Sequence, residues 1–400
     1  MQTSRPEEAG LSSARLGRMS QVMQSYVDQN KLAGLVAMLA RRGRLVYSAC
    51  FGAMDVQAGK PMQPDTIVRL RSMTKPITAV AVMMLYEEGH FQLADPVSRF
   101  IPEFKGGQAL AGQSERGLEL VDLEREITIH DLLIHTSGLA SGFGEDQPLE
   151  ALYQEVDADS DRLDITLQDL VHKLASLPRL HQPGRAWRYG WSYAVLGHLV
   201  EVISGMPFDA FLRHRVFEPL DMPDTSFRVP GEKTGRFATL YGPAEEGGLA
   251  VVEGPGQNWK TAYPISGTTG LVSTAHDYMR FAQMLLNGGE LEGARLLGRK
   301  TVELMTLNHV PAELLPIAPL PDSVLHGYGY GLGVAVLMNV AQARAVGTEG
   351  SFGWGGYAST DFWVDPREEL VGLIMAQFAP LGYYPLTEKF QVLAYQAMVD

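Results

Sequence analysis

Residues 71–76 of the chain read RSMTKP and contain the pattern S-x-x-K, in which Ser72 precedes Lys75 by three residues. Apolar residues continue at helical spacing through Ile77, Val80 and Met84, so we expect Ser72 at the start of a helix. A three-residue step places both side chains on one face of that helix, within hydrogen-bond reach. A serine becomes a nucleophile when a base removes its proton, and burial beside a helix N-terminus can make a lysine that base. Alone, the motif is a weak signal, because it also occurs by chance.

The segments on either side of this motif predict an α+β chain with a helical middle. An amphipathic helix is expected over residues 11–29, with Ser12 as its N-cap, and a β-hairpin over residues 34–51. Helical patterns follow at residues 78–86, around Leu132, and at 167–174 and 193–203. Strand-like runs return at residues 332–338, 358–364 and 370–378. Strands at both ends around a helical middle are typical of an α+β domain with a helical insertion.

Two segments are expected to be irregular. Residues 145–164 contain eight carboxylates opposed only by Arg162, which predicts a solvated surface loop. Residues 308–326 contain four prolines, and long irregular loops in compact proteins often border active sites.

The composition excludes several classes of protein. The 400 residues include 33 Lys and Arg against 46 Asp and Glu, a net charge of −13, which argues against a nucleic-acid-binding protein. The single cysteine, Cys50, can form neither an intramolecular disulfide nor a thiolate metal cluster. The first ten residues lack the pattern of a secretory signal, and no apolar run reaches the ~20 residues of a membrane span. We therefore expect a soluble cytoplasmic protein without a membrane partner.

Other catalytic motifs are missing from the sequence. It contains no H-E-x-x-H metal motif and no phosphate-binding loop of the G-x-x-x-x-G-K-[ST] type. Residues 349–353 and 190–194 approach the nucleophile elbow G-x-S-x-G, but each lacks one of its glycines. The S-x-x-K pattern thus remains the candidate for nucleophilic chemistry.

Several further segments, in order, resemble those of the serine β-lactamase and penicillin-binding-protein superfamily. Within it, the chain resembles the class C β-lactamase-like (family VIII) carboxylesterases, from about residue 5 to the C-terminus. The matching segments are SMTK at 72–75, LADPV at 93–97, FIPEF at 100–104, LLIHTSGL at 132–139, QPG at 182–184 followed by WRY at 187–189, and GLVSTA at 270–275. The resemblance implies an antiparallel sheet flanked by helices, formed by residues 1–80 and 225–400. A mainly helical domain of residues 81–224 completes it, with the active site in the cleft between the two.

The resemblance also implies a role for each motif residue. Ser72 would be the acylated nucleophile and Lys75 would assist its deprotonation. Tyr189 occupies the first place of the family's Y-x-N motif and would serve as a base, as tyrosinate or through Lys75. The backbone N–H groups of Ser72 and Tyr357 would form the oxyanion hole. No metal or organic cofactor is expected.

Two departures from the family pattern favour an ester over a lactam. The family's third motif, K-T-G, is replaced here by Trp354-Gly355-Gly356, so the lysine that helps hold a lactam carboxylate is missing. Trp191 stands where the family often has the asparagine that contacts amide substrates. Both changes replace polar anchors with aromatic surface, which suits an uncharged acyl ester. We assign these four residues to substrate binding, with the glycines letting the substrate approach the strand edge.

The sequence therefore predicts a serine carboxylesterase acting on short to medium acyl esters. A β-lactamase, a D-amino-acid peptidase or amide hydrolase, and an acyltransferase stay open, because the same Ser–Lys–Tyr set serves all of them. A non-catalytic scaffold is the alternative from another class, and the intact Ser72, Lys75 and Tyr189 argue against it. The expected partner is a small-molecule ester, and the sequence leaves the oligomeric state open.

Overall fold

The hairpin predicted near the N-terminus forms two adjacent strands of a large sheet. A computed structural model describes residues 2–114, 117–141, 149–160, 162–255, 260–320 and 323–400. Within them a nine-stranded sheet has the order β1-β3-β2-β19-β18-β17-β16-β15, with β4 paired to β3. Its strands are β1 Gln2–Thr3, β2 Gly34–Arg41, β3 Arg44–Asp55, β4 Lys60–Pro61, β15 Tyr328–Tyr330, β16 Ala335–Leu337, β17 Phe352–Gly356, β18 Thr360–Asp365 and β19 Leu370–Ala376.

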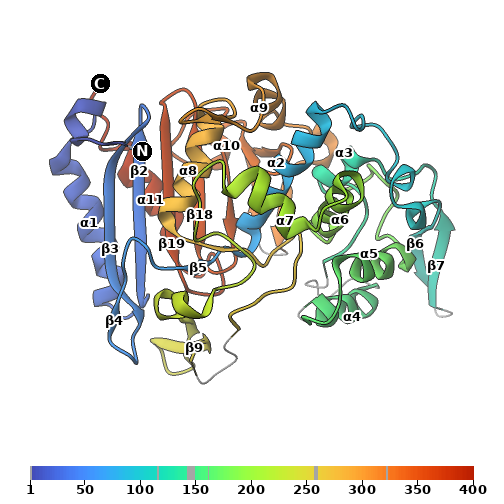
Figure 1. Ribbon diagram of the computed structural model, residues 1–400, viewed down its shortest axis with the longest axis horizontal. Helices are drawn as coiled ribbons and strands as arrows, with labels where there is room; N and C mark the ends of the chain where they lie inside the picture. Colours follow the sequence, from blue (N-terminus) through green and yellow to red (C-terminus); the bar gives the residue numbers. More distant parts are fainter. Residues whose placement is uncertain (1, 115–116, 142–148, 161, 256–259, 321–322) are drawn as a thin grey trace.

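The two ends of the chain meet in the middle of this sheet. Strand β2 pairs antiparallel with β19 from Leu35↔Ala376 to Arg41↔Leu370. Every residue of β2 is buried, because both faces of the sheet are covered. Residues 35, 37 and 39 pack with α1 and α11, whereas residues 36, 38 and 40 pack in the core that contains α2 and α8. Figure 1 shows these helices around the sheet.

The helices occupy both faces of the sheet and a second group beside it. Figure 1 shows α3 to α6 grouped to the right of the sheet, with the β6–β7 ribbon at the far edge. The helices are α1 Ser13–Asp28, α2 Thr74–Glu87, α3 Ile129–Leu133, α4 Glu150–Ser160, α5 Leu167–Ser176, α6 Ser192–Ser204, α7 Phe208–Leu212, α8 Ala275–Leu286, α9 Arg299–Met305, α10 Val340–Ala343 and α11 Leu386–Tyr395. The α+β fold class is confirmed. The predicted domain boundaries stay a prediction, and the one at residue 80 falls inside α2.

Short two-stranded ribbons connect these larger elements. Their strands are β5 Val68–Arg69 with β10 Val272–Ser273, β6 Gln108–Ser114 with β7 Gly117–Asp122, β8 Leu240–Pro243 with β9 Leu249–Glu253, β11 Glu290–Leu291 with β12 Ala294–Arg295, and β13 Ile317–Leu320 with β14 Ser323–Leu325. The last pair lies in the proline-containing segment that was expected to be irregular. The β5–β10 pair matters most for function, because β5 leads directly into the S-x-x-K motif.

The acidic segment contains a helix where a solvated loop was predicted. Residues 150–160 form α4, and Tyr153 and Val156 on it are fully buried. Their three-residue spacing is helical, and burial of this apolar edge stabilises a helix despite the surrounding carboxylates. Residues 145–148 and 161 of the predicted loop lie outside the described residues.

Within the described residues, no helix alone has the length and apolar composition to cross a membrane. The bent pair Ser192–Ser204 and Phe208–Phe217 meets that criterion only when its two helices are taken together.

Candidate active site

The predicted nucleophile lies in a tight turn at the beginning of the buried helix α2. Ser72 is the middle residue of a 3-10 turn, Arg71–Met73, that continues into α2. The preceding Leu70 is fixed on both sides: its N–H donates to the Leu271 carbonyl (2.9 Å), and its carbonyl accepts from Thr360 Oγ1 (3.2 Å). The turn is therefore held between the ribbon strand β10 and the main sheet.

Lys75 is buried beside Ser72. Its side chain belongs to a residue only 1% exposed, and Nζ lies 3.2 Å from Ser72 Oγ. Nζ also donates to the Thr268 carbonyl at 2.9 Å. Burial lowers the pKa of Lys75 well below its usual range, because the charged ammonium loses its hydration. An uncharged amine that donates to Thr268 keeps its lone pair available for the Ser72 proton.

Tyr189 approaches this pair from the other group of helices. It lies just before α6, and the Lys75 Nζ is 4.5 Å from the centre of its ring. Burial raises the pKa of Tyr189 to about 12, although hydrogen bonds from Ser72 and Trp354 act in the opposite direction. The phenol is thus protonated at neutral pH and can donate its proton. The structure brings Ser72, Lys75 and Tyr189 together, as the motifs predicted.

Strand β17 forms the opposite wall of the site. The indole of Trp354 lies 5.6 Å from the Tyr189 ring, centre to centre, and its Nε1 donates to the Tyr189 hydroxyl at 3.3 Å. A Cβ on Gly356 would lie 2.1 Å from the Leu70 carbonyl oxygen, so only glycine lets the strand approach the nucleophile turn so closely. A Cβ on Gly355 would meet the Asp361 carboxylate at 2.6 Å. Both glycines therefore have a packing reason that is independent of substrate approach.

The remaining predicted site residues lie near these elements. Tyr357 directly follows β17, and about half of its side chain is exposed. Trp191 is buried at the start of α6, where its backbone N–H donates to the Ala140 carbonyl at 3.1 Å. The oxyanion hole and the substrate contacts of Trp191, Trp354, Gly355 and Gly356 stay predictions.

His135 is a buried residue beside the candidate site to which the sequence assigned no role. It has a left-handed backbone with φ of 60° and no exposed surface. Its ring lies 4.7 Å from that of Tyr189, centre to centre, and also contacts those of Trp187, Tyr193 and Tyr330. Burial lowers the pKa of His135 well below its usual range, so the ring is neutral. The LLIHTSGL match at residues 132–139 is the signal that could have identified it.

The same segment also holds the loop that carries Tyr189. The His135 carbonyl accepts from the N–H of Arg188, and the Thr136 carbonyl accepts from the N–H of Gly184, both at 2.8 Å. Ser137 Oγ and Ser192 Oγ are 2.8 Å apart, which joins the segment to the first residue of α6. The HTSG segment thus fixes the approach of Tyr189 to Lys75.

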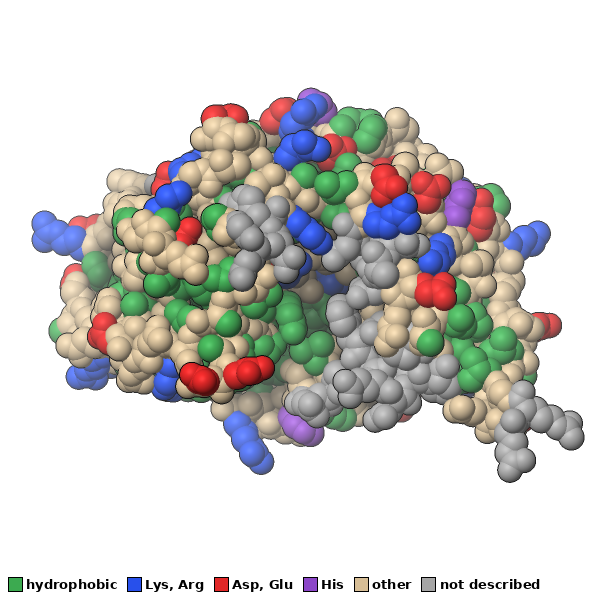
Figure 2. All heavy atoms as spheres, turned by 90° about the horizontal axis from the view of Figure 1, so that it is seen from below, with side chains coloured by type: hydrophobic (Ala, Val, Ile, Leu, Met, Phe, Trp, Pro, Cys, Tyr) green, Lys and Arg blue, Asp and Glu red, His purple; other side chains and the backbone are tan. Residues whose placement is uncertain are grey.

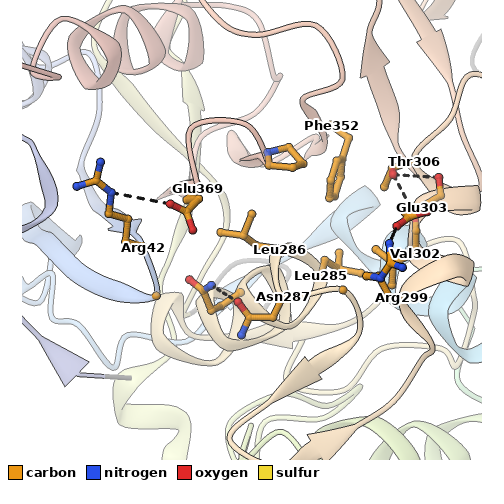
Figure 3. Close-up of a pocket in the computed structure, with 14 residues that line it drawn as sticks. Arg42, Leu285, Leu286, Asn287, Arg299, Val302, Glu303, Thr306, Phe352 and Glu369 are labelled. Atoms are coloured by element: carbon orange, nitrogen blue, oxygen red, sulfur yellow. Dashed lines mark hydrogen bonds and ion pairs between the residues drawn. The ribbon is translucent and has the colours of Figure 1, made fainter. Parts of the chain in front are cut away.

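Two views show hollows of the molecular surface. Figure 2 shows a central hollow on the face seen from below, with hydrophobic side chains along one side of it. A cavity of about 560 Å³, shown in Figure 3, lies between α8, α9 and the turn after β2. Apolar residues such as Leu286 and Phe352 line it together with the ion pair of Arg42 and Glu369. Ser72, Lys75 and Tyr189 are not among its lining residues.

Comparison with known proteins gives a consistent result along nearly the whole chain. The model of the family described as Beta-lactamase matches residues 19–395. Protein Rv1367c of Mycobacterium tuberculosis is 36% identical over 365 residues, covering 90% of this chain and 89% of its own length. Esterase EstB of Burkholderia gladioli is 32% identical over 404 residues, covering 96% of both chains. The solved structure of "EstCE1, a hydrolase with promiscuous acyltransferase activity" has a TM-score of 0.81 at 26% identity, covering 96% of this chain and 98% of that one. The β-lactamase and penicillin-binding-protein-like fold is thereby confirmed.

Proposed function

The chain belongs to the beta-lactamase family, and from this premise we propose that it is a serine carboxylesterase acting on uncharged esters of short to medium acyl chains. The observation that carries the proposal is the buried Lys75 amine 3.2 Å from Ser72 Oγ, with Trp354 rather than a cation on the facing strand. The similarity to an esterase, EstB, supports it.

In the proposed acylation step, Lys75 accepts the Ser72 proton while Oγ attacks the ester carbonyl. The N–H groups of Ser72 and Tyr357 would stabilise the negative charge on the carbonyl oxygen. Tyr189 then donates its phenolic proton to the alkoxy oxygen, the C–O bond breaks and the alcohol leaves. Lys75 returns the proton to Tyr189, whose ring lies 4.5 Å from Nζ.

The deacylation step repeats this path with water. Lys75, directly or through Tyr189, takes a proton from a water molecule that attacks the acyl carbonyl. The bond to Ser72 Oγ breaks, the acid leaves, and the serine regains its proton. This assignment makes the lysine the base and the tyrosine the proton donor, because burial holds the pKa of Tyr189 at about 12.

The expected substrate preference can be tested with paired chromogenic substrates. We expect kcat/KM for p-nitrophenyl acetate and butyrate to exceed that for a chromogenic cephalosporin by at least about 100-fold, because nothing in the third motif replaces the carboxylate-binding lysine. The measurement is kcat/KM for all three compounds under one set of conditions. Faster turnover of the cephalosporin would contradict the ester assignment and restore the lactamase or peptidase alternatives.

A transferase is the second candidate, favoured by the similarity to EstCE1, a hydrolase described as having promiscuous acyltransferase activity. The acyl-enzyme at Ser72 can react with any hydroxyl that reaches the position of the water. The partition is measured by hydrolysing p-nitrophenyl butyrate with added 1-propanol and quantifying propyl butyrate against butyric acid. Ester as the main product at low alcohol concentration would favour the transferase.

The pH dependence of turnover should report on Lys75. We expect kcat/KM to rise with pH as the Lys75 ammonium loses its proton, because only the neutral amine can accept the Ser72 proton. The rise in kcat/KM should be centred at a pH well below the usual pKa of lysine. Deprotonation of Tyr189 should lower the activity only near pH 12, because its pKa is raised to about 12. Tyr189→Phe is expected to lower the plateau of kcat/KM by about 100-fold without moving the acid limb. Loss of the limb in this variant would assign that titration to Tyr189 instead.

A further inference from the structure

A buried carboxylate lies directly behind the turn that carries the nucleophile. Glu253 is the last residue of β9 and is 6% exposed. Its Oε1 is 2.9 Å from Arg69 Nη2, and its Oε2 is 3.2 Å from Arg71 Nη2. The Tyr263 hydroxyl also donates to Oε1. One carboxylate therefore joins Arg71, which immediately precedes Ser72, to Arg69, which lies three positions before Ser72.

The ion pair between Glu253 and Arg71 holds a residue whose backbone conformation is unfavourable. Arg71 has a φ of 50°, a left-handed conformation that is unfavourable for a residue with a Cβ. This conformation turns the chain from β5 into the helix that presents Ser72 and Lys75. The Arg71 side chain is 29% exposed, so without an anchor the guanidinium and the turn would have more freedom to move.

Arg69 gives Glu253 a fixed point of attachment. Its guanidinium lies 4.1 Å from the centre of the Phe237 ring, and its Nη1 donates to the Ala238 carbonyl at 2.7 Å. Its backbone N–H donates to Gln377 Oε1 at 3.0 Å, and Gln377 Nε2 donates back to the Arg69 carbonyl at 3.2 Å. Glu253 is thus held on one side by a rigid arginine and holds Arg71 on the other.

We propose that Glu253 is a positioning residue for the nucleophile. By anchoring Arg71, it fixes the turn in the conformation that keeps Ser72 Oγ within reach of the Lys75 amine. The carboxylate acts through Arg71 and does not itself contact the reacting atoms. This inference rests on the proposed function, because it assumes that Ser72 is the residue acylated.

The test uses three variants of the full chain. Arg71→Met removes the anchored arm but leaves the buried Arg69–Glu253 pair intact, so it is expected to fold. Glu253→Gln weakens both contacts, and Glu253→Asp keeps the charge on a shorter side chain. For Arg71→Met and Glu253→Gln we expect kcat for p-nitrophenyl butyrate to fall about 10- to 100-fold, with KM changed less than about threefold. The rate at which a phosphonate labels Ser72 should fall by the same factor, and Glu253→Asp should recover part of it.

The matched control is Asp224→Asn. Asp224 is a partly buried carboxylate that is also held by two cations, with Lys233 Nζ and Arg236 Nη2 each 2.7 Å away, but it contacts neither Arg71 nor Ser72 in the described structure. The rate at which the phosphonate labels Ser72 in the Asp224→Asn variant should stay within about twofold of the rate in the unmutated protein. Unchanged labelling in a folded Arg71→Met variant would overturn the positioning role, as would an equal loss in Asp224→Asn. Failure of the phosphonate to label Ser72 in the unmutated protein would instead contradict the proposed function.

Discussion

Replacing Ser72 with alanine should abolish ester turnover while leaving the fold unchanged. We expect kcat to fall by at least about 10⁴-fold, because the acyl-enzyme cannot form without the serine oxygen. The substitution removes one hydroxyl that lies 3.2 Å from Lys75 Nζ, so the free energy of unfolding should change by no more than about 1 kcal/mol. Residual turnover and chemical unfolding, measured on the same preparation, check both parts.

Covalent trapping gives this prediction its control. A phosphonate ester incubated with the unmutated protein should add one group, and peptide mass spectrometry should locate it on Ser72. The Ser72→Ala variant should add none. A label on another serine, such as Ser192 at the start of α6, would contradict the assignment of the nucleophile. No turnover of any ester in a broad panel by the unmutated protein would revive the scaffold alternative.

The parts of the fold that follow a strict hydrophobic pattern could be predicted from the sequence. The helix expected over residues 11–29 is α1, Ser13–Asp28, and the Ser12 side chain caps it by accepting from the Arg15 N–H. The first strand of the hairpin expected over residues 34–51 is β2, Gly34–Arg41. In both, burial on one or two faces imposes a regular apolar period on the sequence.

Elements with little buried surface show no sustained apolar pattern in the sequence. The ribbon of β6 and β7, residues 108–114 and 117–122, lies in a part of the chain that was predicted to be helical. Ala109 is its only fully buried residue among those described, and the alternation of apolar and polar residues at 118–120 is too short to predict a strand. Helix α4 was missed for the opposite reason, because its many carboxylates obscured the two buried residues that stabilise it.

The residues of the candidate site also fall into those that the sequence could predict and those that it could not. Ser72 and Lys75 were predicted to meet because they are three residues apart on one helix, and Tyr189 was added by the resemblance. Glu253 could not be found in this way, because it is 182 residues from Arg71 and its role depends on a contact between a ribbon and the nucleophile turn. The environment of His135 likewise depends on tertiary contacts. The rings around it belong to residues distant in the sequence: Trp187, Tyr189, Tyr193 and Tyr330.

Replacing Lys75 with methionine should remove activity and stabilise the protein. Without the amine, no other group that the structure describes near Ser72 is in a state to accept its proton, because Tyr189 is protonated and His135 is enclosed by aromatic rings. We expect kcat to fall by about 10³-fold or more. Methionine has a similar volume and keeps the packing of this fully buried position. A KM that changes little would show that the loss lies in the chemical step.

The gain in stability has a defined dependence on pH. Because the pKa of Lys75 is lowered in the folded protein, the unfolded chain binds more protons between that value and the usual pKa of lysine. The unmutated protein is therefore least stable, relative to Lys75→Met, below the folded pKa, and the difference must shrink as the pH rises through this window. At neutral pH we expect the variant to be more stable by about 1–3 kcal/mol, even after losing the hydrogen bond to the Thr268 carbonyl. Urea unfolding of both proteins at several pH values measures the difference. A variant less stable than the unmutated protein at neutral pH would show that Lys75 is not held in its neutral form, and would remove the basis for assigning it as the base.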